Sequence, residues 1–128
     1  MTLSISSATV LSDKTAAASS STTLSECTSI DGSALVALGF YVRLTYGSGG
    51  TLPTAGAVVQ VYGSPDDSLW SSWPIQEVDV PLPAAGGACG IAFTTLPGHK
   101  YYKVRVKNLD AAQAITQIYV LSEPQVLS

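Results

Sequence analysis

The stretch that decides the fold is residues 96–121, LPGHKYYKVRVKNLDAAQAITQIYVL. Its first half alternates between basic and apolar side chains, because Lys103, Arg105 and Lys107 are separated by single valines. Successive side chains of a β-strand point to opposite faces, so this pattern predicts a strand with one buried face and one wet, cationic face. The second half predicts another strand. The short polar loop between the two halves predicts a hairpin.

The same alternation recurs along the chain. Residues 35–46 are the clearest case, because Phe40, Val42 and Leu44 share one face while Arg43 lies on the other. Pro81 predicts an edge strand, or the end of a strand, since proline cannot donate to a sheet ladder. The predicted strands are residues 2–11, 35–46, 57–62, 77–82, 89–95, 100–108 and 115–121. Short strands separated by Gly, Pro and Ser turns predict an all-β protein with a single antiparallel β-sandwich, of immunoglobulin-like or jelly-roll wiring.

The first 26 residues differ in composition from the rest. After a weak alternation, residues 12–26 read SDKTAAASSSTTLSE, which is too rich in Ser and Thr for a helix. This composition predicts a loop or an extended segment on the surface. We therefore divide the chain into two parts: residues 1–26 form an extended N-terminal arm or edge strand with a Ser/Thr/Ala-rich loop, and residues 27–128 form the β-sandwich domain. We expect the domain to fold without the arm.

Composition excludes several classes of function. The 128 residues fit one domain, and 12% of them are charged, against about 25% in average soluble proteins. A surface with few charges is easily desolvated, which favours contact with protein neighbours, although a plain β-domain with a polar, uncharged surface fits equally well. The net charge of −3 argues against nucleic-acid binding, which needs a basic field. No apolar run approaches the ~20 residues of a membrane span, and no secretion signal is visible, so we expect no membrane partner and synthesis in a cytoplasm.

No residue pattern indicates catalysis. Cys27 and Cys89 lack metal-ligand spacing, and we expect two buried or half-buried free thiols, with a long-range disulfide as the alternative. His99 lies in a Pro-Gly-His-Lys turn with no partner in the sequence, so we expect it on the surface. Nucleotide-binding glycine motifs and the G-x-S-x-G motif are missing from the sequence. The sequence therefore predicts a protein that is not an enzyme, with no catalytic residue, metal or cofactor.

The basic stripe, defined as Lys103, Arg105 and Lys107, is the first candidate contact site. Three cations on one strand would make only a weak nucleic-acid site. We expect the stripe to contact an acidic protein surface or to pair with Glu77 and Asp79, which alternate in the same manner along their own strand.

Three aromatic residues form the second candidate. Tyr62, Trp70 and Trp73 could stack on a sugar ring, because aromatic faces bind the C–H surface of sugars. The alternative is that one indole plugs the end of the core and the other lies under a loop or at a subunit contact.

Residues 97–120, PGHKYYKVRVKNLDAAQAITQIYV, resemble the C-terminal strands of small β-domain virion proteins of tailed bacteriophages. In those proteins a Pro-Gly turn leads into a Tyr-rich strand, and an Asn-Leu-Asp turn and an Ala/Thr-rich final strand follow. Residues 58–67, VVQVYGSPDD, resemble the matching upstream strand and turn. The resemblance covers about half of the chain and carries no catalytic residues.

This resemblance implies a structural role in a phage particle, where decoration (cement) proteins, neck and tail proteins and head fibres use such domains. We expect a capsid decoration protein in the virion, bound to other virion proteins and to its own copies, that stabilises the assembled shell by protein–protein contacts. The alternatives are a neck, tail or head-fibre component, or a carbohydrate-binding or host-adhesion module that uses Trp70 and Trp73.

Overall fold

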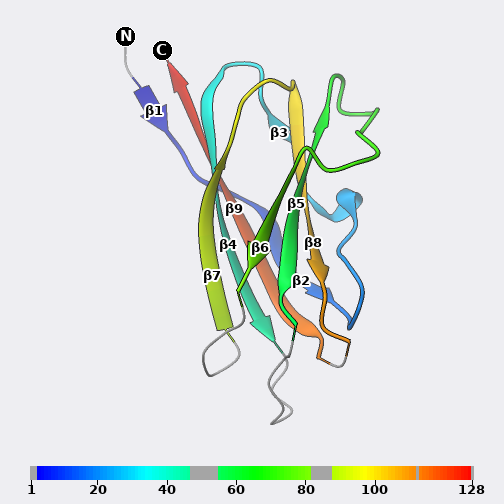
Figure 1. Cartoon of the computed structure of the whole chain (residues 1–128). Helices are drawn as coiled ribbons and strands as arrows, with labels where there is room; N and C mark the ends of the chain where they lie inside the picture. The colour runs from blue at the N-terminus through cyan, green and yellow to red at the C-terminus, as the bar shows by residue number, and fades with distance from the viewer. Residues whose placement is uncertain (1–2, 47–54, 82–87, 112, 128) are drawn as a thin grey trace.

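The computed structural model describes residues 3–46, 55–81, 88–111 and 113–127 (Figure 1). Within these ranges almost every regular element is a strand, and no helix is long and apolar enough to cross a membrane. The elements, in chain order, are β1 (Leu3–Ile5), β2 (Ala8–Ala16), the 3₁₀ helix η1 (Leu24–Glu26), β3 (Ile30–Asp31), β4 (Leu35–Tyr46), β5 (Ala57–Ser64), β6 (Gln76–Val80), β7 (Ala88–Thr95), β8 (Tyr101–Asn108) and β9 (Ile115–Leu127).

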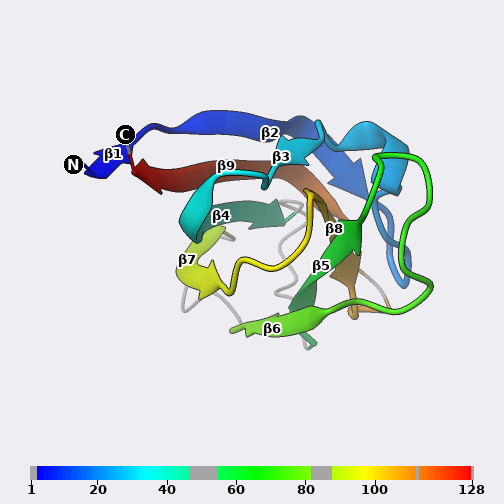
Figure 2. The ribbon, with the colours of Figure 1, turned by 90° about the horizontal axis from the view of Figure 1, so that it is seen from above.

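The strands pair antiparallel into two sheets. The first sheet has the order β1-β9-β4-β7, with β2 also paired to β9, and the second has the order β3-β8-β5-β6. Figure 2 shows the first sheet as one layer that curls toward β7, and β8, β5 and β6 as the other layer. The predicted all-β sandwich is therefore confirmed. Pro81 follows β6, which is an edge strand of the second sheet, as predicted.

The core lies between the two sheets. Val42 and Leu44 of β4 are wholly buried, and Val104 and Val106 of β8 belong to the same core from the other layer, while Arg43 is exposed. Burying one large aliphatic side chain stabilises a fold by roughly 1.5–3 kcal/mol, so two such rows account for much of the driving force. The alternation of apolar and polar residues that predicted β4 and β8 therefore matches the alternation of buried and exposed side chains along these strands.

The predicted hairpin of β8 and β9 is wrong, because the two strands lie in different sheets. Each buries one apolar face, and the two faces meet the same core from opposite layers. The loop between them crosses the sandwich and is held by Asn108, which is wholly buried. Its side-chain amide donates to the carbonyls of Ala17 and Gln113, at 3.3 and 2.8 Å.

The N-terminal segment contributes a core strand. Residues 12–16 were expected in a surface loop, but they belong to β2, which pairs with β9 and buries Val10, Leu11 and Ala16. The division of the chain at residue 26 stays a prediction. The expectation that residues 27–128 fold alone now conflicts with the burial of β2, because its removal would expose one side of β9.

The Ser/Thr-rich stretch after β2 covers the edge of β8. The carbonyl of Ser20 accepts a hydrogen bond from the amide of Asn108 at 2.8 Å, and the amide of Thr22 donates to the carbonyl of Val106 at 3.0 Å. An uncovered strand edge invites pairing with other chains, so this segment closes one side of the sandwich.

The last strand extends beyond the predicted range 115–121, because β9 continues to Leu127. Pro124 is the register partner of Leu38, and Leu127 that of Leu3. The last residue of the predicted strand 77–82 lies outside the described residues.

Candidate functional site

The basic stripe and two of the three candidate aromatic residues meet on the outer face of the second sheet. Tyr62 of β5 is the register partner of Lys103 of β8. The ammonium of Lys103 lies 5.1 Å from the centroid of the Trp70 ring, and the guanidinium carbon of Arg105 lies 5.2 Å from that of Tyr62. A cation over an aromatic face is attracted by the ring. The basic stripe therefore shares one surface with Tyr62 and Trp70, whereas no such contact involves Trp73 among the described residues.

A chain of hydrogen bonds crosses this face. Arg105 Nε donates to Gln60 Oε1 at 2.9 Å, and Gln60 Nε2 donates to Glu77 Oε2 at 3.0 Å. Glu77 and Asp79 lie on β6, and β5 separates that strand from β8. The expected pairing of the stripe with Glu77 therefore runs through Gln60 instead of directly.

These contacts cover the aromatic residues unequally. Tyr62 is 4% exposed, and Trp70 is half-buried beside Lys103. Trp73 is 81% exposed. Sugar stacking needs an open ring face, and Trp73 is the most exposed of these three residues.

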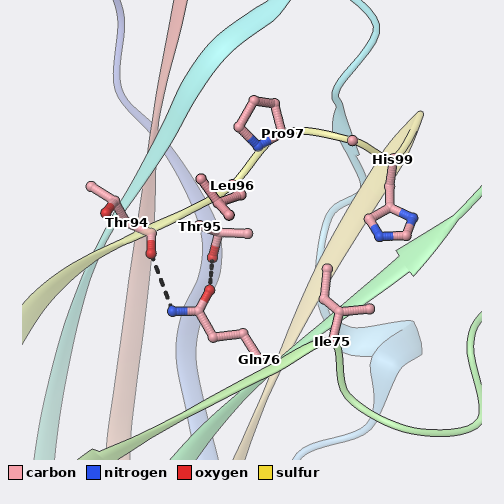
Figure 3. A pocket seen from close by; sticks show the side chains of 8 residues that line it. Ile75, Gln76, Thr94, Thr95, Leu96, Pro97 and His99 are labelled. Carbon is pink, nitrogen blue, oxygen red and sulfur yellow. Dashed lines mark hydrogen bonds between the residues drawn. The ribbon is translucent and has the colours of Figure 1, made fainter.

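A pocket opens where the start of β6 meets the end of β7 (Figure 3). Its volume is about 360 Å³, near the lower end of ligand pockets, which span roughly 300–1,000 Å³. The side chain of Gln76 ties the two strands together, since Nε2 donates to the carbonyl of Thr94 at 3.1 Å and Oε1 accepts from Thr95 Oγ1 at 2.6 Å. The lining residues are Ile75, Gln76, Thr94, Thr95, Leu96, Pro97, Gly98 and His99.

The wall of this pocket formed by residues 96–99 is held in place by Tyr102. Its hydroxyl accepts a hydrogen bond from the amide of His99 at 3.1 Å and donates to the carbonyl of Leu96 at 3.2 Å. Gly63 leaves room for the imidazole, because a Cβ there would lie 2.7 Å from His99 Cγ. The sequence showed the turn and its exposed histidine but no sign of the pocket, which depends on strands from both sheets.

The pocket belongs to an end of the sandwich with many exposed apolar side chains. This apolar end carries the β5–β6 and β7–β8 connections, the start of β4, and β1 (Figure 1). In the described ranges, eight large hydrophobic side chains are exposed, and only Tyr41 and Leu109 lie elsewhere. The other six, all at the apolar end, are Ile5, Val36, Leu69, Trp73, Ile75 and Leu96.

Both cysteines are free thiols, as expected, with Cys27 buried and Cys89 half-buried. Burial raises the pKa of Cys27 to about 11 and also raises that of Cys89. A nucleophilic or metal-binding cysteine needs a lowered pKa, so neither thiol is activated. Across the described residues, no group of three His, Cys, Asp or Glu side chains could hold a metal ion.

No protein-family model and no curated protein sequence matches this chain. Among solved structures, it is similar to the PBSX exported protein XepA, with a TM-score of 0.57 and 12% identity over 96% of this chain and 38% of XepA. It also aligns with a protein of Bacillus endospore appendages, described as a novel family of disulfide-linked pili. That alignment has a TM-score of 0.45 and 15% identity over 99% of this chain and 90% of the other. The similarity to XepA is one of fold, and this chain spans 38% of XepA's length.

Proposed function

We propose that this chain is a non-enzymatic structural protein of a bacteriophage particle and, within that class, a capsid decoration protein that stabilises the assembled shell. The observation that carries the proposal is the apolar end. Exposed apolar side chains that lie together mark contacts with other proteins, and Ile75 and Leu96 at this end line one pocket. Leu96 at 86% and Trp73 at 81% exposure are the most prominent of these side chains.

Two further observations support the proposal. The low charged fraction, 12%, leaves a surface that is easily desolvated against a neighbour. The fold similarity to XepA, an exported protein of the phage PBSX, supports a phage context for this sandwich.

Stabilisation would follow from mass action. A subunit that binds the assembled shell but not its dissociated parts lowers the free energy of the shell, by an amount that grows with subunit concentration. In this proposal the apolar end faces the capsid surface. The pocket beside Gln76 would receive an apolar side chain of the capsid protein, since Ile75, Leu96 and Pro97 provide its apolar lining.

The test uses particles of the encoding phage that lack this protein. Purified protein added back should bind them and raise the temperature at which they break. Leu96→Ser should weaken binding about fivefold or more, because truncating a side chain that anchors the centre of an interface costs more than about 1 kcal/mol. The matched control is Leu109→Ser, which changes an exposed leucine away from the apolar end and should bind like the wild type.

Particles that are equally robust with and without the protein would rule out the decoration role. Binding confined to one vertex of the particle, seen by electron microscopy, would favour the neck or tail alternative over a lattice position. Equal loss of binding for the two leucine variants would exclude the apolar end as the contact surface.

A carbohydrate-binding role is the second candidate, and the open ring of Trp73 is the observation that favours it. If the module binds glycans, Trp73→Ala should abolish binding on a glycan array. Tyr62→Phe should leave binding unchanged, because Arg105 already covers the Tyr62 ring. If the wild-type protein bound no glycan on the array, this alternative would be excluded.

A further inference from the structure

The outer face of the second sheet carries two stripes of opposite charge. β8 contributes the basic stripe, Lys103, Arg105 and Lys107, and β6 contributes Glu77 and Asp79. β5 lies between these strands and contributes no charged residue. The face is therefore positive along one side and negative along the other.

The strand register aligns the two stripes in rows. Val58 is the partner of both Lys107 and Asp79, and in the next row Gln60 is the partner of both Arg105 and Glu77. Adjacent strands lie about 4.8 Å apart, so the two charged strands are separated by roughly 9.6 Å. In the described part of the chain Gln60 bridges its row, whereas no ion pair joins Lys107 to Asp79.

The middle of this face is already packed. Val58, Gln60 and Tyr62 lie on this face of β5, beside Lys107, Arg105 and Lys103, yet all three are buried. A second protein laid on this face would therefore meet a closed surface bordered by charge.

The guanidinium of Arg105 is already ordered by contacts within the chain, before any partner binds. The Gln60 amide fixes its Nε, and the Tyr62 ring lies under it. Arginine has four further N–H donors, which are free to meet a carboxylate. A side chain that is already ordered loses less entropy on binding, which favours its use in an interface.

Symmetry then selects one partner arrangement. Two identical faces can stack about a two-fold axis that lies between them, either along the strands or across them. An axis across the strands puts β8 over the β8 of the other copy, with like charges opposed. An axis along β5 puts β8 over the other copy's β6, so that the rows of Val58 and Gln60, which hold Lys107 and Arg105, each meet an acidic side chain.

We propose that a second copy of this chain docks face to face on this surface, with a two-fold axis along β5. Lys107 then faces the partner's Asp79, and Arg105 faces the partner's Glu77. Each contact occurs twice, as in any symmetric dimer. This self-association goes beyond the proposed role in a particle and does not depend on it, since it can be measured on the purified chain alone.

Analytical ultracentrifugation of the full chain over a range of concentrations tests the proposal. The wild type should form a dimer whose dissociation constant rises with salt, because charge attraction is screened. Lys107→Glu and Asp79→Lys should each weaken the dimer about tenfold or more, since each turns two attractions between the copies into two repulsions.

The decisive arm mixes the two variants in equal amounts. In the mixed dimer both substituted positions again face an opposite charge, so the affinity should return to about the wild-type value. Arg43→Glu reverses an exposed charge on the first sheet and should leave dimerisation unchanged.

A wild type that stays monomeric at every concentration and salt would overturn the proposal. A mixture of the two variants that associates no better than either alone would overturn it as well, because a dimer through another face gives no such rescue. Circular dichroism of each variant would establish that the reversals at these surface positions leave the fold intact.

Discussion

At the residue scale, Cys27 shows how side chains complete the hydrogen bonds of a strand edge. Its Sγ accepts from the amide of Val104 at 3.3 Å and donates to the carbonyl of Thr28 at 3.4 Å. Two residues further along β8, the hydroxyl of Thr22 accepts from the amide of Val106 at 3.0 Å. Buried backbone amides need partners. These two side chains supply them where β3 is too short to do so.

The buried thiol makes stability depend on alkaline pH. The pKa of Cys27 is about 11 in the folded chain against 9.0 for a cysteine thiol in water, because burial disfavours the thiolate. Above pH 9 the unfolded chain loses this proton while the folded chain keeps it, so the free energy of unfolding should fall between pH 9 and 11. The fall due to Cys27 should be about 2–3 kcal/mol. Urea unfolding at several pH values measures it.

Cys27→Ser is the matched variant, because the hydroxyl can still accept from Val104 but does not titrate in this range. Its stability should fall less steeply with pH than that of the wild type. Tyr46, whose pKa burial raises to about 12, titrates in both proteins and cancels in the comparison. Parallel curves for the two proteins would show that Cys27 is not the source.

At the scale of the element, strands were predictable where regular alternation was intact. β4 and β8 each bury one face, and alternation alone located them. β2 was missed beyond residue 11 because its register against β9 shifts three times and Asp13 has a φ of 51°, which breaks the two-residue period. The last residues of β9 were not predicted, because a proline usually ends a strand. Pro124 instead lies within the ladder.

The candidate site was predictable only in its parts. Alternation showed that Lys103 and Arg105 share an outer face. It could not show that β5 lies between β8 and β6, because strand order depends on packing between distant segments. The contacts of Arg105 with Tyr62 and Gln60 follow from that order. The pocket depends on strands from both sheets, and a local pattern cannot reveal it.

The role of β2 leads to a deletion test. Removing residues 1–16 exposes one side of β9 and removes Leu11, which is wholly buried. The truncated chain should therefore not fold, and its thermal denaturation should show no cooperative transition. Loss of one buried leucine side chain alone costs about 2–5 kcal/mol, and a whole domain is stable by only about 5–15 kcal/mol. Removing residues 1–5 takes away only β1 and should preserve a cooperative thermal transition. A folded 17–128 fragment would show that β2 is dispensable.

At the scale of the whole molecule, the two ends of the chain lie side by side. β1 pairs antiparallel with the end of β9, with Leu3 opposite Leu127 (Figure 1). Adjacent ends favour circular permutation, which succeeds at exposed loop tips. A chain that joins residues 127 and 3 through a short linker, and opens between Ser72 and Trp73, should fold. Circular dichroism and a cooperative urea transition would establish this.

The control permutant opens between Gln60 and Val61, in a strand whose residues are all buried. It should not fold, because new charged termini would enter the middle of the second sheet. If both permutants folded, or neither did, folding would not depend on where the chain is opened, and the prediction would be wrong.

The pairing of β1 with β9 also decides how the molecule would respond to tension. Hydrogen bonds of an antiparallel pair run perpendicular to the strands, and both ends of this chain leave from the same side of the ladder. A force that pulls the ends apart therefore loads the bonds one at a time, starting at Leu3 and Leu127. The sandwich would open like a zip at low force, β1 first and β2 next. Mechanical strength in an assembly would have to come from the faces of this protein and not from its ends.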